Sequence, residues 1–185
     1  MSQFTIAVIV GSLRKDSLNR KLATALAKLA PLEFSFKQLE IGDLPRYNQD
    51  DDGSPSEAVK RFKAELGAAQ GALFLTPEYN RSIPGVLKNA LDHASRPYGQ
   101  SAWAGKPAGV LGVSVGAVGT ACAQQHLRTI LAYLDMPTLG QPEAFIQEKD
   151  SLFDATGDIG EGSKQFMTDW MNRYTQWVRR HVAAT

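Results

Sequence analysis

The residues best suited to bind an anion stand between an apolar run and the start of a helical pattern. Residues 11–19 read Gly-Ser-Leu-Arg-Lys-Asp-Ser-Leu-Asn, so hydroxyl and amide side chains and a cation lie just before the predicted helix. Backbone N–H groups at a helix start, the helix dipole and short donor side chains together form a phosphate site. The segment has neither a Walker A pattern nor a G-x-G-x-x-G pattern. A capped turn without a ligand is the alternative interpretation.

Two further segments have residues that suit a flat ring. Residues 76–85 read Thr-Pro-Glu-Tyr-Asn-Arg-Ser-Ile-Pro-Gly, which combines an aromatic ring, an amide and backbone donors with prolines that restrict the shape of the loop. Residues 114–119 read Ser-Val-Gly-Ala-Val-Gly, whose small side chains let a ring approach the backbone closely. Each segment alone is also typical of an ordinary turn, so neither identifies a ligand by itself.

The elements that must position these segments alternate between apolar strands and amphipathic helices. Residues 4–10 are a near-continuous β-branched run, typical of a strand buried on both faces of a parallel sheet. Further strands are predicted at 33–39, 71–76, 110–115 and 144–146, and helices at 17–29, 56–66, 84–91, from 116–119 to 134, and from about 162 onward. This order predicts a doubly wound α/β sandwich, as a single domain over residues 1–185. Ligands of such sheets bind beyond the carboxyl ends of the strands, where the three segments stand.

Composition excludes several classes of protein. The chain has 20 Lys and Arg against 19 Asp and Glu, and this net charge of +1 favours no nucleic-acid partner. Cys122 is the single cysteine, which excludes an intrachain disulfide or a Cys-rich zinc site and suggests a reducing cytoplasm. The first apolar run is too short for a membrane span and lacks the flanks of a signal peptide, so we expect a soluble, unprocessed protein.

Together, the three segments resemble a known family. Residues 11–19 and the run Pro-Glu-Tyr-Asn-Arg-Ser-Ile-Pro-Gly-Val-Leu-Lys-Asn-Ala-Leu-Asp at 77–92 are similar to the motifs of the NADPH-dependent FMN reductases, and within them to the bacterial flavin-dependent quinone and chromate reductases. No position of these motifs departs from the pattern. The resemblance implies a flavodoxin-like three-layer sandwich, in which a five-stranded parallel sheet of order 2-1-3-4-5 carries helices on both faces. It also implies noncovalent FMN, with NADPH or NADH as cosubstrate.

The resemblance also implies which residues bind the cofactor: Ser12, Leu13, Arg14, Lys15, Asp16, Ser17, Leu18, Asn19, Pro77, Glu78, Tyr79, Asn80, Ser114 and Gly116. Those of the first segment would hold the FMN phosphate, Leu18 and Asn19 partly through backbone groups. The second segment would line the isoalloxazine edge and the ribityl chain, and the third would border the ring. The family supplies no protein nucleophile, because the flavin N5 accepts hydride from the nicotinamide and passes electrons to an acceptor in the same pocket.

Three functions share these motifs. The first is an NAD(P)H oxidoreductase that reduces quinones, or chromate, azo compounds or free flavin, by a ping-pong mechanism. The second is a one-electron carrier like flavodoxin; such carriers are typically strongly acidic, which the neutral composition does not favour. The third, a flavin-binding regulator, leaves the motifs unchanged. The small-molecule acceptor is the expected partner, with no nucleic acid and no membrane.

Several conspicuous residues are better explained by structure than by chemistry. Cys122 has no histidine close in sequence, and the three histidines show no metal-ligand spacing, so neither a catalytic thiol nor a metal site is predicted. The acidic run 50–52 is interpreted as a solvated loop. Trp103 is predicted to anchor a turn, and the stripe of Trp170, Met171 and Trp177 to pack on the sheet. Residues 96–99 remain open between a plain loop and a contact with NADPH or a partner subunit.

A homodimer, and beyond it a tetramer, is the expected assembly, with the flavin pocket completed across the subunit boundary. Residues 93–98 continue the third helix beside the flavin loop, and Arg128 and Tyr133 lie away from the apolar stripe of the fourth helix. Tyr and Arg are enriched at interfaces, although a solvated helix face is the alternative. The family resemblance also implies dimers.

Overall fold

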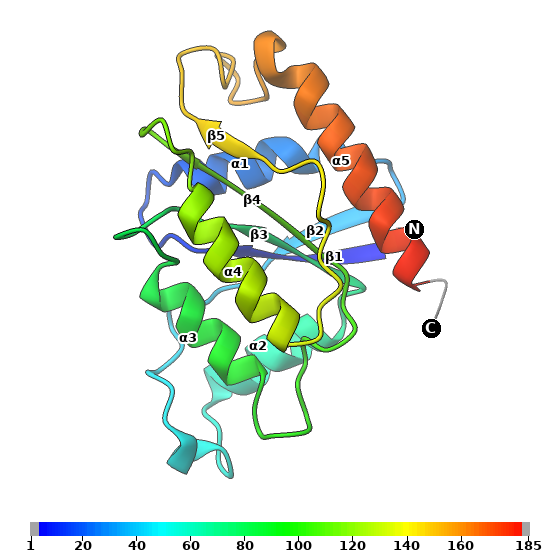
Figure 1. Ribbon diagram of the computed structural model, residues 1–185. Coiled ribbons are helices and arrows are strands. Elements are labelled where there is room, and N and C mark those ends of the chain that lie inside the picture. Colours follow the sequence, from blue (N-terminus) through cyan, green and yellow to red (C-terminus); the bar gives the residue numbers. More distant parts are fainter. Residues whose placement is uncertain (1–3, 183–185) are drawn as a thin grey trace.

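The computed structural model describes residues 4–182 and consists of a parallel sheet between two layers of helices (Figure 1). The sheet has the order β2-β1-β3-β4-β5, which is that of flavodoxin-like folds, so the predicted fold class and strand order are confirmed. The strands are β1 Phe4–Val10, β2 Phe34–Gln38, β3 Gly71–Leu75, β4 Ala108–Ser114 and β5 Phe145–Gln147. The helices are α1 Leu18–Ala27, α2 Glu57–Gly67, α3 Gly85–Ala94, α4 Ala121–Tyr133 and α5 Glu161–Val182, with a short 3-10 helix at Gln49–Asp51.

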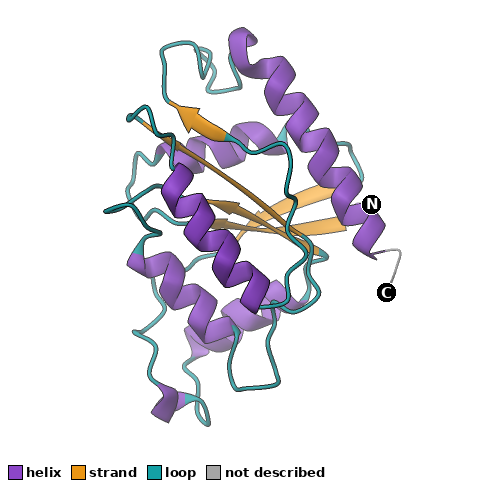
Figure 2. Cartoon of the chain, in the orientation of Figure 1, coloured by secondary structure: helices purple, strands orange, loops and turns teal. Residues whose placement is uncertain are grey.

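The central strands divide their side chains between two cores. In β1, Val8 and Val10 face a cluster formed with α1 and α5, whereas Ala7 and Ile9 face a cluster formed with α2, α3 and α4. Figure 2 shows the helices covering both faces of the sheet. The continuous apolar run of β1 follows from this burial, because each face of a doubly covered strand requires apolar residues.

Two predicted packing roles are confirmed. Trp170 and Met171 are fully buried against the sheet, and Trp177 is partly buried and packs on the same cluster. The Trp170 ring stacks on Tyr174 with 5.6 Å between centroids. Trp103 is also fully buried and donates its indole N–H to the Leu91 carbonyl at 3.0 Å. A Cβ at Gly109 would lie 2.7 Å from the Tyr174 ring, so β4 needs glycine where α5 packs against it.

The fourth strand and the fourth helix differ from the expected bounds. β4 begins at Ala108, two residues earlier than predicted, because the backbone N–H of that residue already bonds Pro137 at 2.9 Å. α4 begins at Ala121 rather than within 116–119, since Gly119 and Thr120 both have left-handed backbone angles that a right-handed helix excludes. Over residues 4–182, none of the helices has both the length and the apolar character that crossing a membrane requires.

Candidate functional site

Three loops meet at the carboxyl edge of the sheet, where the segments of chemical interest were expected. They follow β1, β3 and β4 and lie at the same end of the three central strands (Figure 1). Backbone hydrogen bonds tie the first residues of two of these loops to the neighbouring strands: Gly11 N–H donates to the Leu75 carbonyl of β3 at 2.9 Å, and Thr76 N–H donates to the Leu111 carbonyl of β4 at 3.1 Å. A Cβ at Gly11 would lie 3.2 Å from Pro77 and 3.3 Å from Leu87. Glycine therefore lets the first loop pass close to the second.

The first loop presents a helix N-terminus. Ser17 is the N-cap of α1, and its Oγ accepts a hydrogen bond from the Arg20 N–H at 3.2 Å. This leaves the Ser17 hydroxyl proton free to donate, and the first N–H groups of the helix have no intrahelical acceptor. Ser12 and Ser17 are buried, whereas Leu13 to Asp16 are exposed. The arrangement is that of an anion site at a helix start.

Asn19 has a structural role that the sequence did not indicate. Its side-chain amide is buried and pairs with the backbone of Val113, donating to the carbonyl at 2.9 Å and accepting from the N–H at 3.0 Å. The side chain therefore joins α1 to the end of β4. These two bonds use one of the two N–H donors of the amide, so the second donor and the backbone N–H of Asn19 remain for the predicted phosphate contact.

Arg20 is a candidate that the sequence reasoning missed. Its Nη2 lies 3.5 Å from the Ser12 carbonyl oxygen, and its Nε is buried without a hydrogen-bond partner. An unsatisfied buried guanidinium N–H is costly. An anion bound to this N–H would remove that cost. The available signal in the sequence was a basic residue in the first turn of the helix.

The second loop has a sharply turned backbone. Asn80 and Arg81 have left-handed φ angles of 52° and 65°, and Tyr79 and Ser82 exchange two backbone hydrogen bonds of 2.9 and 3.0 Å. The Tyr79 side chain is 48% exposed at the tip of the loop. The carboxylate of Glu78 instead turns inward, where Oε2 accepts from the Ala123 N–H of α4 at 3.1 Å.

The third loop adds an apolar rim. Val115 and Val118 are exposed beside the turn. Ser114 Oγ donates to the Gly116 carbonyl at 3.1 Å, which tightens the start of the loop. The same edge of the sheet thus carries the N-terminus of α1, which suits an anion, and loops with exposed apolar and aromatic side chains.

Comparisons with known proteins identify the family. The model of the NADPH-dependent FMN reductases matches residues 4–150. A 2-hydroxy-1,4-benzoquinone reductase from a Burkholderia species is 54% identical over 175 residues, covering 94% of this chain and 96% of the relative. The chain belongs to the NADPH-dependent FMN reductase family.

Further relatives agree. A quinone reductase from Pseudomonas putida is 50% identical over 185 residues, covering 99% of this chain and 100% of its own length. The structure of FerB, an NAD(P)H:(acceptor) oxidoreductase from Paracoccus denitrificans, superposes with a TM-score of 0.92 at 44% identity, covering 96% of this chain and 98% of FerB. The predicted enzyme class, an NAD(P)H-dependent FMN reductase or quinone reductase with FMN as cofactor, is confirmed.

The residues present fit FMN. The buried Nε of Arg20 and the N-terminus of α1 suit the phosphate, and Tyr79, Val115 and Val118 offer surface for a ring. The individual residues predicted to bind the cofactor stay a prediction, because their support is the position of their loops and not a bound flavin. The structure brings the three predicted loops to one edge of the sheet.

The residues assigned no chemistry lie as follows. Cys122 is half-buried in the first turn of α4. His93 Nε2 lies 2.8 Å from the Pro45 carbonyl oxygen, and His126 Nδ1 lies 3.0 Å from Ser82 Oγ. Residues 50–52 belong to the 3-10 helix and its C-cap, with Asp50 and Asp51 exposed. Within residues 4–182, His, Cys, Asp and Glu side chains form no group of three that could hold a metal ion.

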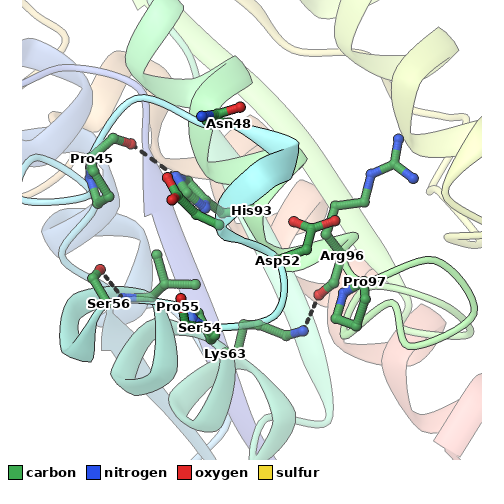
Figure 3. A pocket seen from close by; sticks show the side chains of 12 residues that line it. Pro45, Asn48, Asp52, Ser54, Pro55, Ser56, Lys63, His93, Arg96 and Pro97 are labelled. Carbon is green, nitrogen blue, oxygen red and sulfur yellow. Dashed lines mark hydrogen bonds between the residues drawn. The ribbon is translucent and has the colours of Figure 1, made fainter.

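A cavity of about 280 Å³ lies away from the three loops, between residues 45–56, the start of α2 and the end of α3 (Figure 3). Two of its polar side chains are hydrogen-bonded within the chain: Lys63 Nζ donates to the Arg96 carbonyl, and Ser56 Oγ caps α2. Burial lowers the pKa of the Lys63 ammonium, and nearby Asp52 partly opposes this. Arg96 and Pro97 line this cavity, whereas Tyr98 projects into solvent.

Proposed function

We propose that this enzyme reduces quinones with NAD(P)H by a ping-pong mechanism, in which the nicotinamide and the acceptor occupy one pocket in turn. The observation that carries the proposal is the single open edge at which the α1 N-terminus, the Tyr79 loop and the Val115–Val118 rim meet. One exposed apolar surface beside the proposed cofactor site suits a flat ring, and both the nicotinamide and the quinone contain such a ring. The similarity to the benzoquinone reductase supports a quinone as the acceptor.

The chain contributes binding and orientation to this reaction. Ser12, Arg14 and the start of α1 would hold the FMN phosphate, with Leu13, Lys15 and Asp16 forming the outer part of the same loop. Residues 77–80 would line the ring edge and ribityl chain, and Ser114 and Gly116 would border the ring. Bound FMN supplies hydride acceptance from the nicotinamide and electron delivery to the acceptor. Chromate, azo compounds and free flavin are further acceptors that such an open pocket would admit.

Anaerobic reduction tests this function. We expect NADPH or NADH to bleach the flavin absorbance of the holoenzyme within seconds, and a 1,4-benzoquinone added afterwards to restore it. Initial rates with both substrates varied should give parallel double-reciprocal lines. A carrier or a regulator would bleach slowly or not at all with either nucleotide, and intersecting lines would contradict the ping-pong order. The rate of reoxidation with chromate or an azo dye in place of the quinone then ranks the acceptors.

We also propose a homodimer that pairs through the α3–α4 side and completes the flavin pocket. Tyr98 and Tyr133 are 85% and 84% exposed and line the same hollow. One expected anchor is wrong. The Arg128 side chain is only 16% exposed, and its Nη1 donates to the Leu139 carbonyl at 2.7 Å within the same chain. Burial lowers the pKa of this guanidinium, and Glu143 opposes the shift. The two tyrosines therefore carry the interface proposal.

Light scattering at micromolar concentration checks the assembly. We expect a dimer that persists on dilution and buries more than about 1,000 Å² in total. Tyr133→Glu should raise the dimer dissociation constant at least tenfold, because a carboxylate would be buried at the contact. Phe166→Glu is the matched control, since this exposed aromatic lies on α5, across the sheet from α3 and α4. A monomer with full quinone reductase activity would contradict the proposal.

A further inference from the structure

The hydrogen-bonded ladder between β3 and β4 ends before the two loops that flank the proposed ring site. β3 and β4 pair up to Leu75 and Leu111, and the Thr76 N–H makes one further bond to Leu111 at 3.1 Å. Beyond that point the strand ladder no longer sets the spacing between residues 77–84 and 114–120. A ring held between these loops requires a fixed spacing, so other contacts must supply it.

The start of α4 lacks its usual cap. Thr120 occupies the N-cap position with a left-handed φ of 71°, and its side chain makes no cap hydrogen bond. Its Oγ1 instead accepts from Gln124 Nε2 at 3.0 Å, and the first turn of the helix contains no acidic residue. The Ala123 N–H, in that first turn, therefore needs an acceptor from elsewhere.

Glu78 supplies this acceptor from the other loop. Its Oε2 accepts from the Ala123 N–H at 3.1 Å, 45 residues away in sequence, and its side chain is only 11% exposed. Its Oε1 lies 3.4 Å from Arg81 Nη1, on the turn of the same loop. A carboxylate at a helix N-terminus is also favoured by the helix dipole. Glu78 thus links the Tyr79 loop to the first turn of α4, which follows the Val115–Val118 loop. One turn further along the same helix, His126 Nδ1 lies 3.0 Å from Ser82 Oγ of the Tyr79 loop.

We propose that Glu78 is a positioning residue for the flavin reaction: by capping α4 across the site, it sets the spacing of the two loops and thereby the orientation of the ring. This rests on the proposed function. The role depends on the reach of the side chain rather than on its charge, because a neutral acceptor at the same place makes the same hydrogen bond. The cofactor contact predicted for residue 78 then belongs to its backbone.

Two variants separate reach from charge. Glu78→Gln keeps an oxygen acceptor at the same distance and loses the charge, whereas Glu78→Asp keeps the charge and is one methylene too short. At saturating FMN, we expect the rate of anaerobic flavin reduction by NADPH to fall at least tenfold in E78D and less than threefold in E78Q. The visible circular dichroism of the bound flavin should change in E78D alone.

Ser56→Ala is the matched control, since it removes the N-cap hydrogen bond of α2, which Val59 N–H donates to Ser56 Oγ at 3.4 Å, away from all three loops. If Glu78 only stabilises the start of α4, E78D and S56A should lose thermal stability to the same extent. Both variants should then keep the wild-type rate of flavin reduction and the wild-type dichroism of the flavin. That result would overturn the proposal, as would an E78Q variant as slow as E78D. If the wild-type protein binds FMN but NADPH does not reduce it, the proposed function fails, and the dichroism comparison still decides the role of Glu78.

Discussion

Ser17→Asp should fold as well as the wild-type protein and bind FMN at least 100-fold more weakly. Aspartate is as good an N-cap as serine, and its charge is favoured at the start of α1, so the thermal stability of the apoprotein should stay the same or rise. The proposed phosphate would lie against the new carboxylate. Two like charges about 5 Å apart repel by roughly 3 kcal/mol at an effective dielectric constant of 20, and each 1.4 kcal/mol corresponds to about a factor of ten in affinity.

Two controls make this test specific: riboflavin as a ligand without the phosphate, and an aspartate substitution at a second N-cap serine. Riboflavin lacks the phosphate, so its affinity should be weaker than that of FMN for the wild-type protein and nearly unchanged by S17D. Ser56→Asp places the same substitution at the N-cap of α2, and it should leave FMN affinity unaltered. Dissociation constants from flavin fluorescence titration provide the measurement. An S17D protein that keeps wild-type affinity for FMN would remove Ser17, and with it the start of α1, from the phosphate site.

The fold could be predicted because its signals are local. The buried strand β1 is nearly continuous in β-branched residues, and Ser17 and Ser56 begin their helices as N-caps, as the sequence indicates. Local signals also place the three loops at one edge, because all carboxyl ends of a parallel sheet point the same way. Resemblance to a family added the strand order and the cofactor.

The internal contacts of the site could not be predicted, because they join residues far apart in sequence. The Asn19 amide is occupied by Val113, 94 residues away, and the Glu78 carboxylate by Ala123. Both residues were predicted to face the cofactor, since a polar side chain in a motif does not reveal which backbone group it will meet. Arg128 shows the same limit at the proposed interface: its helical position suggested exposure, yet the Leu139 carbonyl holds it within the chain.

Gly119→Ala should destabilise the protein by about 3 kcal/mol and weaken FMN binding. Gly119 has a φ of 59°, and a left-handed backbone costs a residue with a Cβ roughly 1–2 kcal/mol. The added Cβ would also lie 2.6 Å from the carbonyl carbon of Phe145 and 2.8 Å from the Ile146 nitrogen. These are backbone atoms of β5 and cannot rotate away, and such overpacking costs about 1–3 kcal/mol more. Either β5 or the 114–120 loop must shift.

Comparison with Gly157→Ala separates the steric cost of the Gly119 substitution from the cost of a left-handed backbone. Gly157 has a comparable φ of 82°, but a Cβ there would meet no atom within 4 Å. We therefore expect G157A to lose only about 1 kcal/mol and to keep its FMN affinity. Urea unfolding of the apoproteins at one protomer concentration measures the two free energies of unfolding, which should differ by about 2 kcal/mol. In thermal unfolding, the loss of about 3 kcal/mol in G119A corresponds to roughly 6–12 °C in Tm for a chain of this size. Equal losses in the two variants would mean that the contact between Gly119 and β5 does not constrain the 114–120 loop. This loop, which is the third wall of the proposed flavin site, would then be free to adjust to the ring.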